Sequence, residues 1–246
     1  MPIIQELIRD DYTFEQAELI QIKYQKFIKE HSINSNFLRF EKIKTVAGVD
    51  VSYFYKDNYE YGVACAVLWN LKENKMESYY TTKEPIIFPY KPGFLGFREV
   101  KILAKVISKL PYTPDLIMCD GHGKIHPKQF GEATHLGVAL NIPTIGIAKN
   151  PYIGYSNWKE IKTRRGNKSP IWVNNPDNFS DPSLNKILGY AICLNDGLKP
   201  VFISEGYRIK INTALEISLK TTKKHRQPEP IYLSDFVSRK EIKNLT

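Results

Sequence analysis

Residues 115–127 are the most informative part of this chain and read Asp115-Leu-Ile-Met-Cys-Asp120-Gly-His-Gly-Lys-Ile-His126-Pro127. Four mostly apolar residues end in a carboxylate, and a turn with two glycines and two histidines follows at once. Many α/β enzymes hold a metal ion beside a phosphate at such a turn, with an Asp at the C-terminal end of a buried strand. The pattern favours an α/β fold with a site at Asp120, although a buried strand that merely ends in a capping Asp is an open alternative.

A second carboxylate lies in the segment Thr45-Val-Ala-Gly-Val-Asp50-Val-Ser-Tyr-Phe-Tyr55. Small and β-branched residues flank Asp50 on both sides, which predicts the middle of a strand. A carboxylate there is costly to bury unless it is paired, protonated or bound to a cation. The alternative is an Asp on the wet face of an alternating strand.

A third carboxylate ends the segment Phe88-Pro-Tyr90-Lys-Pro92-Gly93-Phe-Leu-Gly-Phe-Arg-Glu99. Apolar residues then recur with helical spacing, at Phe97, Val100, Leu103, Val106, Ile107 and Leu110. We therefore expect Glu99 in the first turn of a helix, where it could also simply complement the helix dipole.

Together these carboxylates suit a divalent cation. Hard cations prefer oxygen ligands, so Asp50, Glu99 and Asp120 suit Mg²⁺, with Mn²⁺ as a second possibility. Two such cations about 4 Å apart can bind a phosphodiester, activate water and stabilise the leaving oxyanion. No Ser or Cys nucleophile constellation competes. Lys149, at a strand end, either contacts a phosphate or water or is a plain surface lysine.

The segments resemble the endonuclease V family. The resemblance runs from about Glu15 to Arg239, in the family's order and approximate spacing. It rests on Ala-Gly-Val-Asp50-Val-Ser, Pro89-Tyr-Lys-Pro-Gly-Phe-Leu-Gly-Phe-Arg-Glu99, Asp120-Gly-His-Gly-Lys-Ile-His-Pro127, Pro143-Thr-Ile-Gly-Ile-Ala-Lys149, Pro200-Val-Phe-Ile-Ser-Glu-Gly-Tyr-Arg-Ile209 and Arg226-Gln-Pro-Glu-Pro230. It implies an RNase H-like fold, a mixed sheet flanked by helices, and metal-dependent cleavage of DNA or RNA at the second phosphodiester 3′ of inosine.

The resemblance also implies roles for individual residues. Asp50, Glu99 and Asp120 are the implied metal ligands and, with Lys149, the implied catalytic set. The loop around Tyr90 resembles the family's wedge, which separates strands beside the altered base; a packed turn tyrosine is the alternative without the resemblance. The implied substrate-binding residues are Pro89, Tyr90, Lys91, Pro92, Gly93, Gly121, Gly123 and His126. Lys91 departs from the apolar residue more usual in the wedge.

One departure concerns the C-terminal motifs. The family normally has Ser-Pro-Gly-His, where this chain has Ser204-Glu-Gly-Tyr207, and the missing histidine is thought to support the metal site. The family's Tyr-Arg-Leu-Pro-Glu-Pro is here His225-Arg-Gln-Pro-Glu-Pro230. Tyr207 and His225 are therefore possible accessory residues: His225 either compensates for Tyr207 or is one member of a basic run.

Composition is consistent with a nucleic-acid partner. The 246 residues carry 35 Lys and Arg against 26 Asp and Glu, a net charge of +9, which favours a polyanionic partner. We expect one domain over residues 1–246, with no membrane span, no obligatory protein partner and a monomeric state. Cys65, Cys119 and Cys193 in apolar runs suggest free thiols in the cytoplasm.

The expected order of elements is α/β. We predict helices at 14–30, after Glu99, and at 129–141, 212–220 and 231–243. We predict strands at 45–55, 62–70, 76–82, 144–149, 171–173, 188–194 and 200–204, besides the strand that ends at Asp120. Residues 150–182 form a largely irregular insertion.

Two other functions stay open. One is a protein that binds inosine or branched nucleic acid but cleaves weakly, because Tyr207 replaces the expected histidine. The other is a different RNase H-like repair nuclease, although the nuclease part of bacterial excision repair lacks the Pro-Tyr-x-Pro wedge. The sequence does not decide between DNA and RNA as the substrate.

Overall fold

A computed structural model describes residues 3–32, 36–178, 181 and 185–245. The strands are β1 (Thr45–Lys56), β2 (Tyr59–Asn70), β3 (Lys75–Pro85), β4 (Leu116–Cys119), β5 (Thr144–Ala148), β6 (Lys168–Trp172), β7 (Ile187–Ile192) and β8 (Val201–Tyr207). The α-helices are α1 (Phe14–Ser32), α2 (Leu95–Ser108), α3 (Glu132–Leu140), α4 (Ile211–Lys220) and α5 (Glu229–Leu245). Short 3₁₀ helices are η1 (Gln5–Ile8), η2 (Phe40–Lys42), η3 (Trp158–Glu160) and η4 (Pro176–Asn178).

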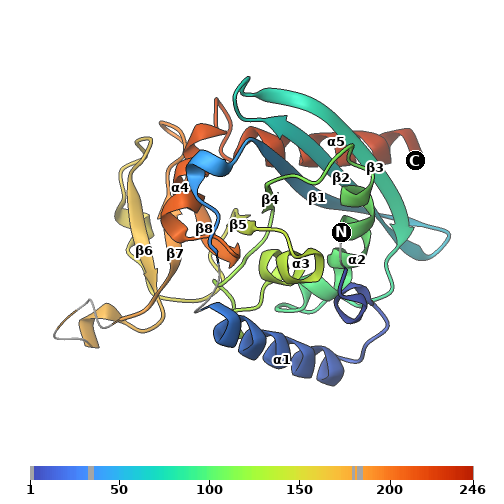
Figure 1. Cartoon of the computed structure of the whole chain (residues 1–246), viewed down its shortest axis with the longest axis horizontal. Coiled ribbons are helices and arrows are strands. Elements are labelled where there is room, and N and C mark those ends of the chain that lie inside the picture. The colour runs from blue at the N-terminus through green and yellow to red at the C-terminus, as the bar shows by residue number, and fades with distance from the viewer. Residues whose placement is uncertain (1–2, 33–35, 179–180, 182–184, 246) are drawn as a thin grey trace.

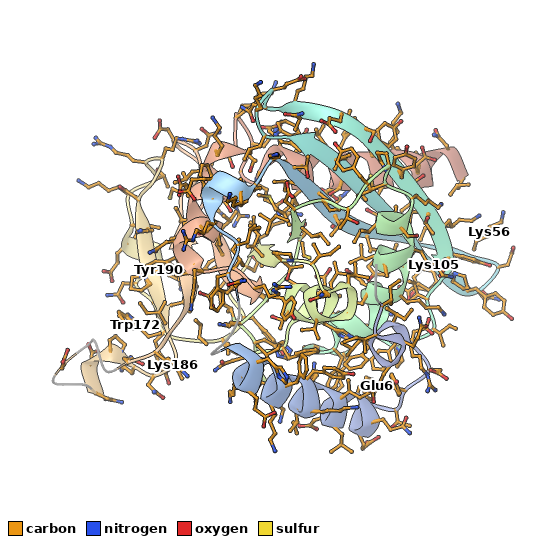
Figure 2. The ribbon with its side chains drawn as sticks, in the orientation of Figure 1. Glu6, Lys56, Lys105, Trp172, Lys186 and Tyr190 are labelled. Atoms are coloured by element: carbon orange, nitrogen blue, oxygen red, sulfur yellow. The ribbon has the colours of Figure 1, made fainter. Side chains whose placement is uncertain are left out.

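The described strands form one mixed sheet in the order β3-β2-β1-β4-β5-β8-β7-β6. The first three strands are antiparallel neighbours, β4 and β5 run parallel to β1, and β8, β7 and β6 continue antiparallel. The sheet crosses the whole molecule, from Lys56 at the end of β1 to Trp172 in β6 (Figure 2). Three antiparallel strands followed by two parallel ones confirm the predicted α/β fold with its RNase H-like layer.

Helices cover both faces of the sheet (Figure 1). On one face, α1, α2 and α3 pack on alternate residues of β1, namely Ala47, Val49 and Val51. On the other face, α4 and α5 pack over Val46 of β1 and Met118 of β4. Successive side chains of a strand point to opposite faces, so this alternation decides which helices each strand residue meets.

Several predicted boundaries need correction. Glu99 is the fifth residue of α2, because the helix begins at Leu95, and it therefore lies in the second turn rather than the first. Helix α3 begins only at Glu132, since residues 121–131 form a loop instead of its predicted first turn. Strand β8 continues to Tyr207, three residues beyond its predicted end, because it pairs with β5 as far as Thr144.

The predicted irregular segment 150–182 contains η3, the whole of β6 and η4, so it extends the sheet by an edge strand. Residues 179–180 and 182 of that segment lie outside the described residues. None of the helices in the described part of the chain is long and apolar enough to cross a membrane.

Candidate active site

Asp50 and Asp120 lie side by side at the centre of the sheet. Val49 of β1 pairs with Cys119 of β4 in a parallel ladder, and the backbone N–H of Asp120 lies 3.4 Å from the carbonyl oxygen of Val49. Residues that are adjacent across such a ladder point to the same face. Both carboxylates therefore face α5, and Ser238 of α5 donates a hydrogen bond to Oδ2 of Asp50 over 3.3 Å.

Glu99 approaches from the opposite side. It is buried in α2, and the hydroxyl of Tyr53 in β1 donates a hydrogen bond to its Oε1. Glu132, the first residue of α3, interacts with the Glu99 carboxyl, so two acidic side chains meet in the layer between the sheet and these helices.

Asp120 is held by two donors. Nζ of Lys149, the residue just beyond β5, donates to Oδ2 over 2.6 Å, and Nε2 of Gln227 donates to Oδ1 over 2.9 Å. The same Lys149 nitrogen lies 3.9 Å from Oδ2 of Asp235 in α5. Lys149 thus links two carboxylates that come from different layers of the fold, and it is not a plain surface lysine.

The pKa values of these groups reflect crowding of like charges. Burial, with the charges of Asp120 and Asp235, raises the pKa of Asp50 to about 7. Burial also raises the pKa of Glu99 well above its ordinary value, and the neighbouring Glu132 adds to the effect. Burial raises the pKa of Glu132 in the same direction. A nearby cation would favour the ionised forms.

Burial lowers the pKa of Lys149, but Asp120 and Asp235 together raise it above the ordinary value. Lys149 is therefore an ammonium group near neutral pH and acts as a hydrogen-bond donor rather than as a base.

The donor chemistry fits a hard divalent cation, since carboxylate oxygens crowd together and repel one another. However, no three His, Cys, Asp or Glu side chains of the described residues stand in an arrangement that could hold a metal ion as they are. Asp120 is bonded to Lys149 and Gln227, and Glu99 to Tyr53. A cation that binds here competes with these partners.

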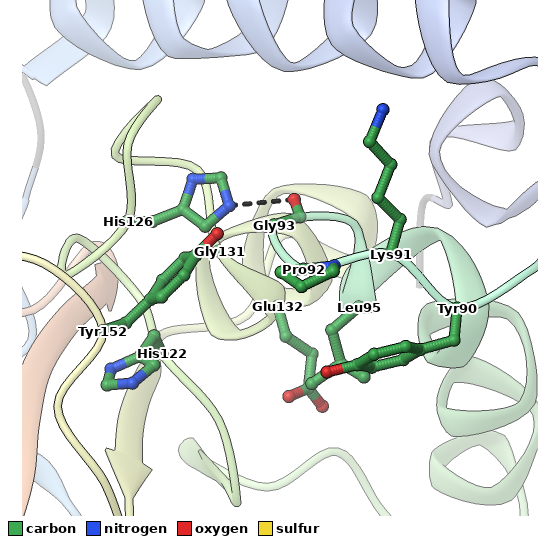
Figure 3. Close-up of a pocket in the computed structure, with 10 residues that line it drawn as sticks. All are labelled: Tyr90, Lys91, Pro92, Gly93, Leu95, His122, His126, Gly131, Glu132 and Tyr152. Atoms are coloured by element: carbon green, nitrogen blue, oxygen red, sulfur yellow. Dashed lines mark hydrogen bonds between the residues drawn. The ribbon is translucent and has the colours of Figure 1, made fainter.

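The loop of residues 89–92 projects beside this site. All four residues are exposed, and the Tyr90 side chain is 71% exposed. Beneath the loop, Phe88 and Phe97 stack against one another and are buried, which anchors its base. Lys91 turns away from Tyr90 (Figure 3), with Nζ 4.5 Å from the ring centroid of Phe14 in α1.

A pocket of about 170 Å³ lies between this loop and the turn after β4 (Figure 3). It is lined by Tyr90, Lys91, Pro92, Gly93, Leu95, His122, His126, Gly131, Glu132 and Tyr152. The rings of His122 and Tyr152 stack with centroids 6.0 Å apart. A cavity of roughly this size holds a benzene ring, so a planar ring can enter between these aromatic side chains.

His126 fixes the edge of this pocket. Its Nε2 donates to the carbonyl oxygen of Gly93 over 2.9 Å, and its Nδ1 accepts from the backbone N–H of Lys128. Burial lowers the pKa of His126, which agrees with a neutral ring in both contacts. Gly93 has φ of 88°, a conformation that favours glycine, and also accepts a hydrogen bond from Gln21 of α1.

Gly121 and Gly123 are not among the described residues that line this pocket. A Cβ on Gly121 would stand 1.9 Å from Oε2 of Glu132, and one on Gly123 would stand 2.1 Å from the carbonyl oxygen of Glu205. These glycines let the turn pack against α3 and β8.

Tyr207 and His225 have separate partners. Tyr207 pairs with Thr144 at the start of β5 and donates to Asn141 over 3.3 Å, whereas Lys149 follows the other end of β5. His225 bonds to Glu229 over 2.9 Å and stacks on Tyr232. No hydrogen bond within the described residues joins either side chain to Asp50, Glu99 or Asp120.

Sequence reasoning missed three residues at this site. Asp235 comes from the second turn of α5, Gln227 from the segment before α5, and Glu132 from the start of α3. Glu132 reads as an ordinary first-turn acid, and Asp235 as the polar face of a surface helix. Gln227 offered one signal, because it stands where the resembled motif has leucine.

The site combines several neighbouring carboxylates with one lysine and lies beside an aromatic pocket on an RNase H-like sheet. These features define an enzyme of the nuclease class. The family model of Endonuclease V matches residues 26–236. The Endonuclease V of Dictyoglomus thermophilum is 36% identical over 223 residues, which cover 90% of this chain and 89% of that protein.

Solved structures agree. The crystal structure of Endonuclease V from Streptomyces avermitilis has a TM-score of 0.79 at 31% identity and covers 95% of this chain and 94% of its own. Ciona intestinalis Endonuclease V was solved in complex with DNA containing an inosine followed by a ribo-adenosine. That structure has a TM-score of 0.78 at 30% identity, and the match covers 96% of this chain and 100% of that chain. The chain belongs to the Endonuclease V family, and it is an endonuclease, a hydrolase of nucleic acid.

Proposed function

We propose that this enzyme cleaves DNA or RNA at the second phosphodiester 3′ of inosine, with Mg²⁺ or Mn²⁺ as cofactor. The observation that carries the proposal is the placement of Asp50 and Asp120 on one face of the sheet, with Lys149 bonded to Asp120. The inosine-containing DNA in the similar Ciona intestinalis structure supports the choice of substrate.

Asp50, Glu99 and Asp120 would hold the cation through carboxylate oxygens. When bound, a divalent cation supplies Lewis-acid stabilisation of the phosphate charge and of the leaving oxygen. Without it, the buried carboxylates repel both one another and the phosphodiester, so the protein alone is poorly suited to binding the scissile phosphate.

Lys149 and Asp235 would position the attacking water. The ammonium of Lys149 donates a hydrogen bond, and the carboxylate of Asp235, 3.9 Å away, accepts one. Water adds to phosphorus and gives up one proton, the bond from phosphorus to the leaving oxygen breaks, and the leaving oxygen takes up one proton. Such positioning groups act by orientation.

The exposed Tyr90 would fill the gap left when the altered base leaves the stack, and the neighbouring aromatic pocket would take the extruded base. Two prolines stiffen the loop, and buried phenylalanines anchor it. His126 would line that pocket and hold Gly93 in place.

We further propose that residues 1–246 act as one domain and as a monomer, since one continuous sheet carries the elements that supply the site. The three cysteines are free and buried, which supports a reducing compartment such as the cytoplasm.

One experiment tests the proposal. Inosine-containing single-stranded RNA, single-stranded DNA and duplex DNA are incubated with the enzyme and Mg²⁺ or Mn²⁺, and the product ends are mapped. Matched adenosine and guanosine substrates serve as controls. We expect cleavage one nucleotide beyond the inosine's own 3′ linkage and none in chelator.

Binding to inosine substrates without cleavage would support the alternative of a weakly cleaving binding protein. Equal cleavage of inosine and control substrates would contradict the proposed specificity.

A further inference from the structure

Glu132 is a buried acidic side chain that the proposed catalytic set does not use. It is 4% exposed, and its Oε2 has no hydrogen-bond partner within the described residues. Leaving a buried polar atom unsatisfied costs about 1–3 kcal/mol, and more for a charged group. A cation beside this oxygen would give it the partner it lacks.

Helix capping does not explain Glu132. It is the first residue of α3, yet Gly131 is the N-cap and no side chain caps this end. The backbone N–H groups of Ala133 and His135 donate to the carbonyl oxygens of His122 and Gly131 instead. The carboxyl group therefore makes no capping hydrogen bond at this helix end.

The position of the carboxyl group points to the acidic site. It interacts with the Glu99 carboxyl and lies within electrostatic range of Asp50 and Asp120. Gly121, which follows Asp120, leaves the space for Oε2, because a Cβ there would stand 1.9 Å from that atom. In Figure 3 the side chain points away from His126 and Gly93.

We propose that Glu132 is a fourth carboxylate of the divalent-cation site and supplies it with a ligand oxygen. The inference rests on the proposed cation dependence and extends it to a residue of α3. A cation offers the unpartnered oxygen the interaction it lacks, and it relieves the repulsion between the crowded carboxyl groups of Glu99 and Glu132. The glycine beside Asp120 makes room for this ligand.

The test measures Mn²⁺ binding to the metal-free protein by isothermal titration calorimetry, using MnCl₂ alone. The variants are Glu132→Gln, which keeps the shape, and Glu132→Leu, which removes both oxygens. We expect affinity at least about tenfold weaker in both variants, with a smaller Mn²⁺-induced rise in melting temperature. The control is Glu216→Gln, on the exposed face of α4, which makes the same charge change and should bind as the wild type does.

The melting temperature of each metal-free variant shows that it is folded, and Glu132→Gln alone decides the matter if Glu132→Leu does not fold. Wild-type affinity and stoichiometry in Glu132→Gln and Glu132→Leu would overturn the inference and leave the proposed function standing. If the wild-type protein shows no Mn²⁺ binding that is lost in Asp50→Asn, both this inference and the proposed cation dependence are overturned.

Discussion

Nε2 of Gln227 donates a hydrogen bond to Oδ1 of Asp120 over 2.9 Å, and the same nitrogen lies 3.3 Å from the carbonyl oxygen of Ile147 in β5. Gln227 is buried, so it ties the segment before α5 to the carboxylate at the end of β4. The resembled motif has leucine here, which could not make this bond.

Gln227→Leu should therefore disturb Asp120 without removing it. Loss of one donor frees the carboxylate to rotate, and we expect Mn²⁺ affinity and cleavage to fall by about tenfold, as for other groups that orient metal ligands. Calorimetry and single-turnover cleavage measure the two effects. Unchanged values in both would show that Lys149 alone orients Asp120.

Asp120→Asn should lower the cleavage rate by at least about a thousandfold, because it removes a charge that the cation needs. Binding of the inosine substrate should stay within a few-fold of wild type, since contacts of basic side chains with phosphates supply most of the affinity. Gel-shift and cleavage assays on one substrate separate these effects. Parallel losses of binding and cleavage would argue against the metal role.

Asp50 should make the metal-free protein less stable as pH rises. Its pKa is raised to about 7 from an unfolded value near 3.8, so between these values the folded state binds more protons than the unfolded state. Stability from this group is therefore present below about pH 4 and is lost as pH rises through 7. Each pKa unit corresponds to about 1.4 kcal/mol.

Asp50→Asn should consequently raise the free energy of unfolding of the metal-free protein at pH 8 by about 1–3 kcal/mol, and by little at pH 4. Denaturant unfolding in the presence of chelator, at pH 8 and at pH 4, measures this change in the free energy of unfolding. A variant that is less stable than wild type at pH 8 contradicts the raised pKa.

Tyr90→Ala should reduce inosine cleavage in duplex DNA by about tenfold or more and in single strands by less than threefold, because a single strand needs no separation. Tyr55→Ala is the matched control, since Tyr55 is 72% exposed at the end of β1. Equal losses on duplex and single-stranded substrates would remove the wedge from the mechanism.

His225→Ala should change cleavage by less than threefold, because the imidazole is bonded to Glu229 and stacked on Tyr232. Stability should fall by about 1 kcal/mol through the lost stacking and hydrogen bond. Adding Tyr207→His in that background should not increase cleavage. A strong loss in His225→Ala, partly restored by Tyr207→His, would instead support compensation between the two positions.

Much of the fold follows from the sequence alone. Small and β-branched residues around Asp50 and the apolar run before Asp120 predicted two central strands, because such residues pack well on a pleated, buried surface whatever the partner strands are. Helical spacing after Glu99 predicted α2, but its first turn is Leu95-Gly-Phe-Arg, which carries no acidic cap to mark the start. The prolines around Tyr90 predicted an exposed, stiff loop, and the loop is exposed.

The neighbours of these residues were decided only by the tertiary structure. A local pattern tells which face of its own element a side chain occupies, but strand pairing and helix packing decide which elements meet there. Asp50 and Asp120 share a face because β1 and β4 pair in parallel at Val49 and Cys119. Glu132 reaches the site from a segment with no local signal for it, and the only signal at Gln227 is its departure from the resembled motif. Burial and an unpartnered oxygen arise only when distant parts of the chain pack together.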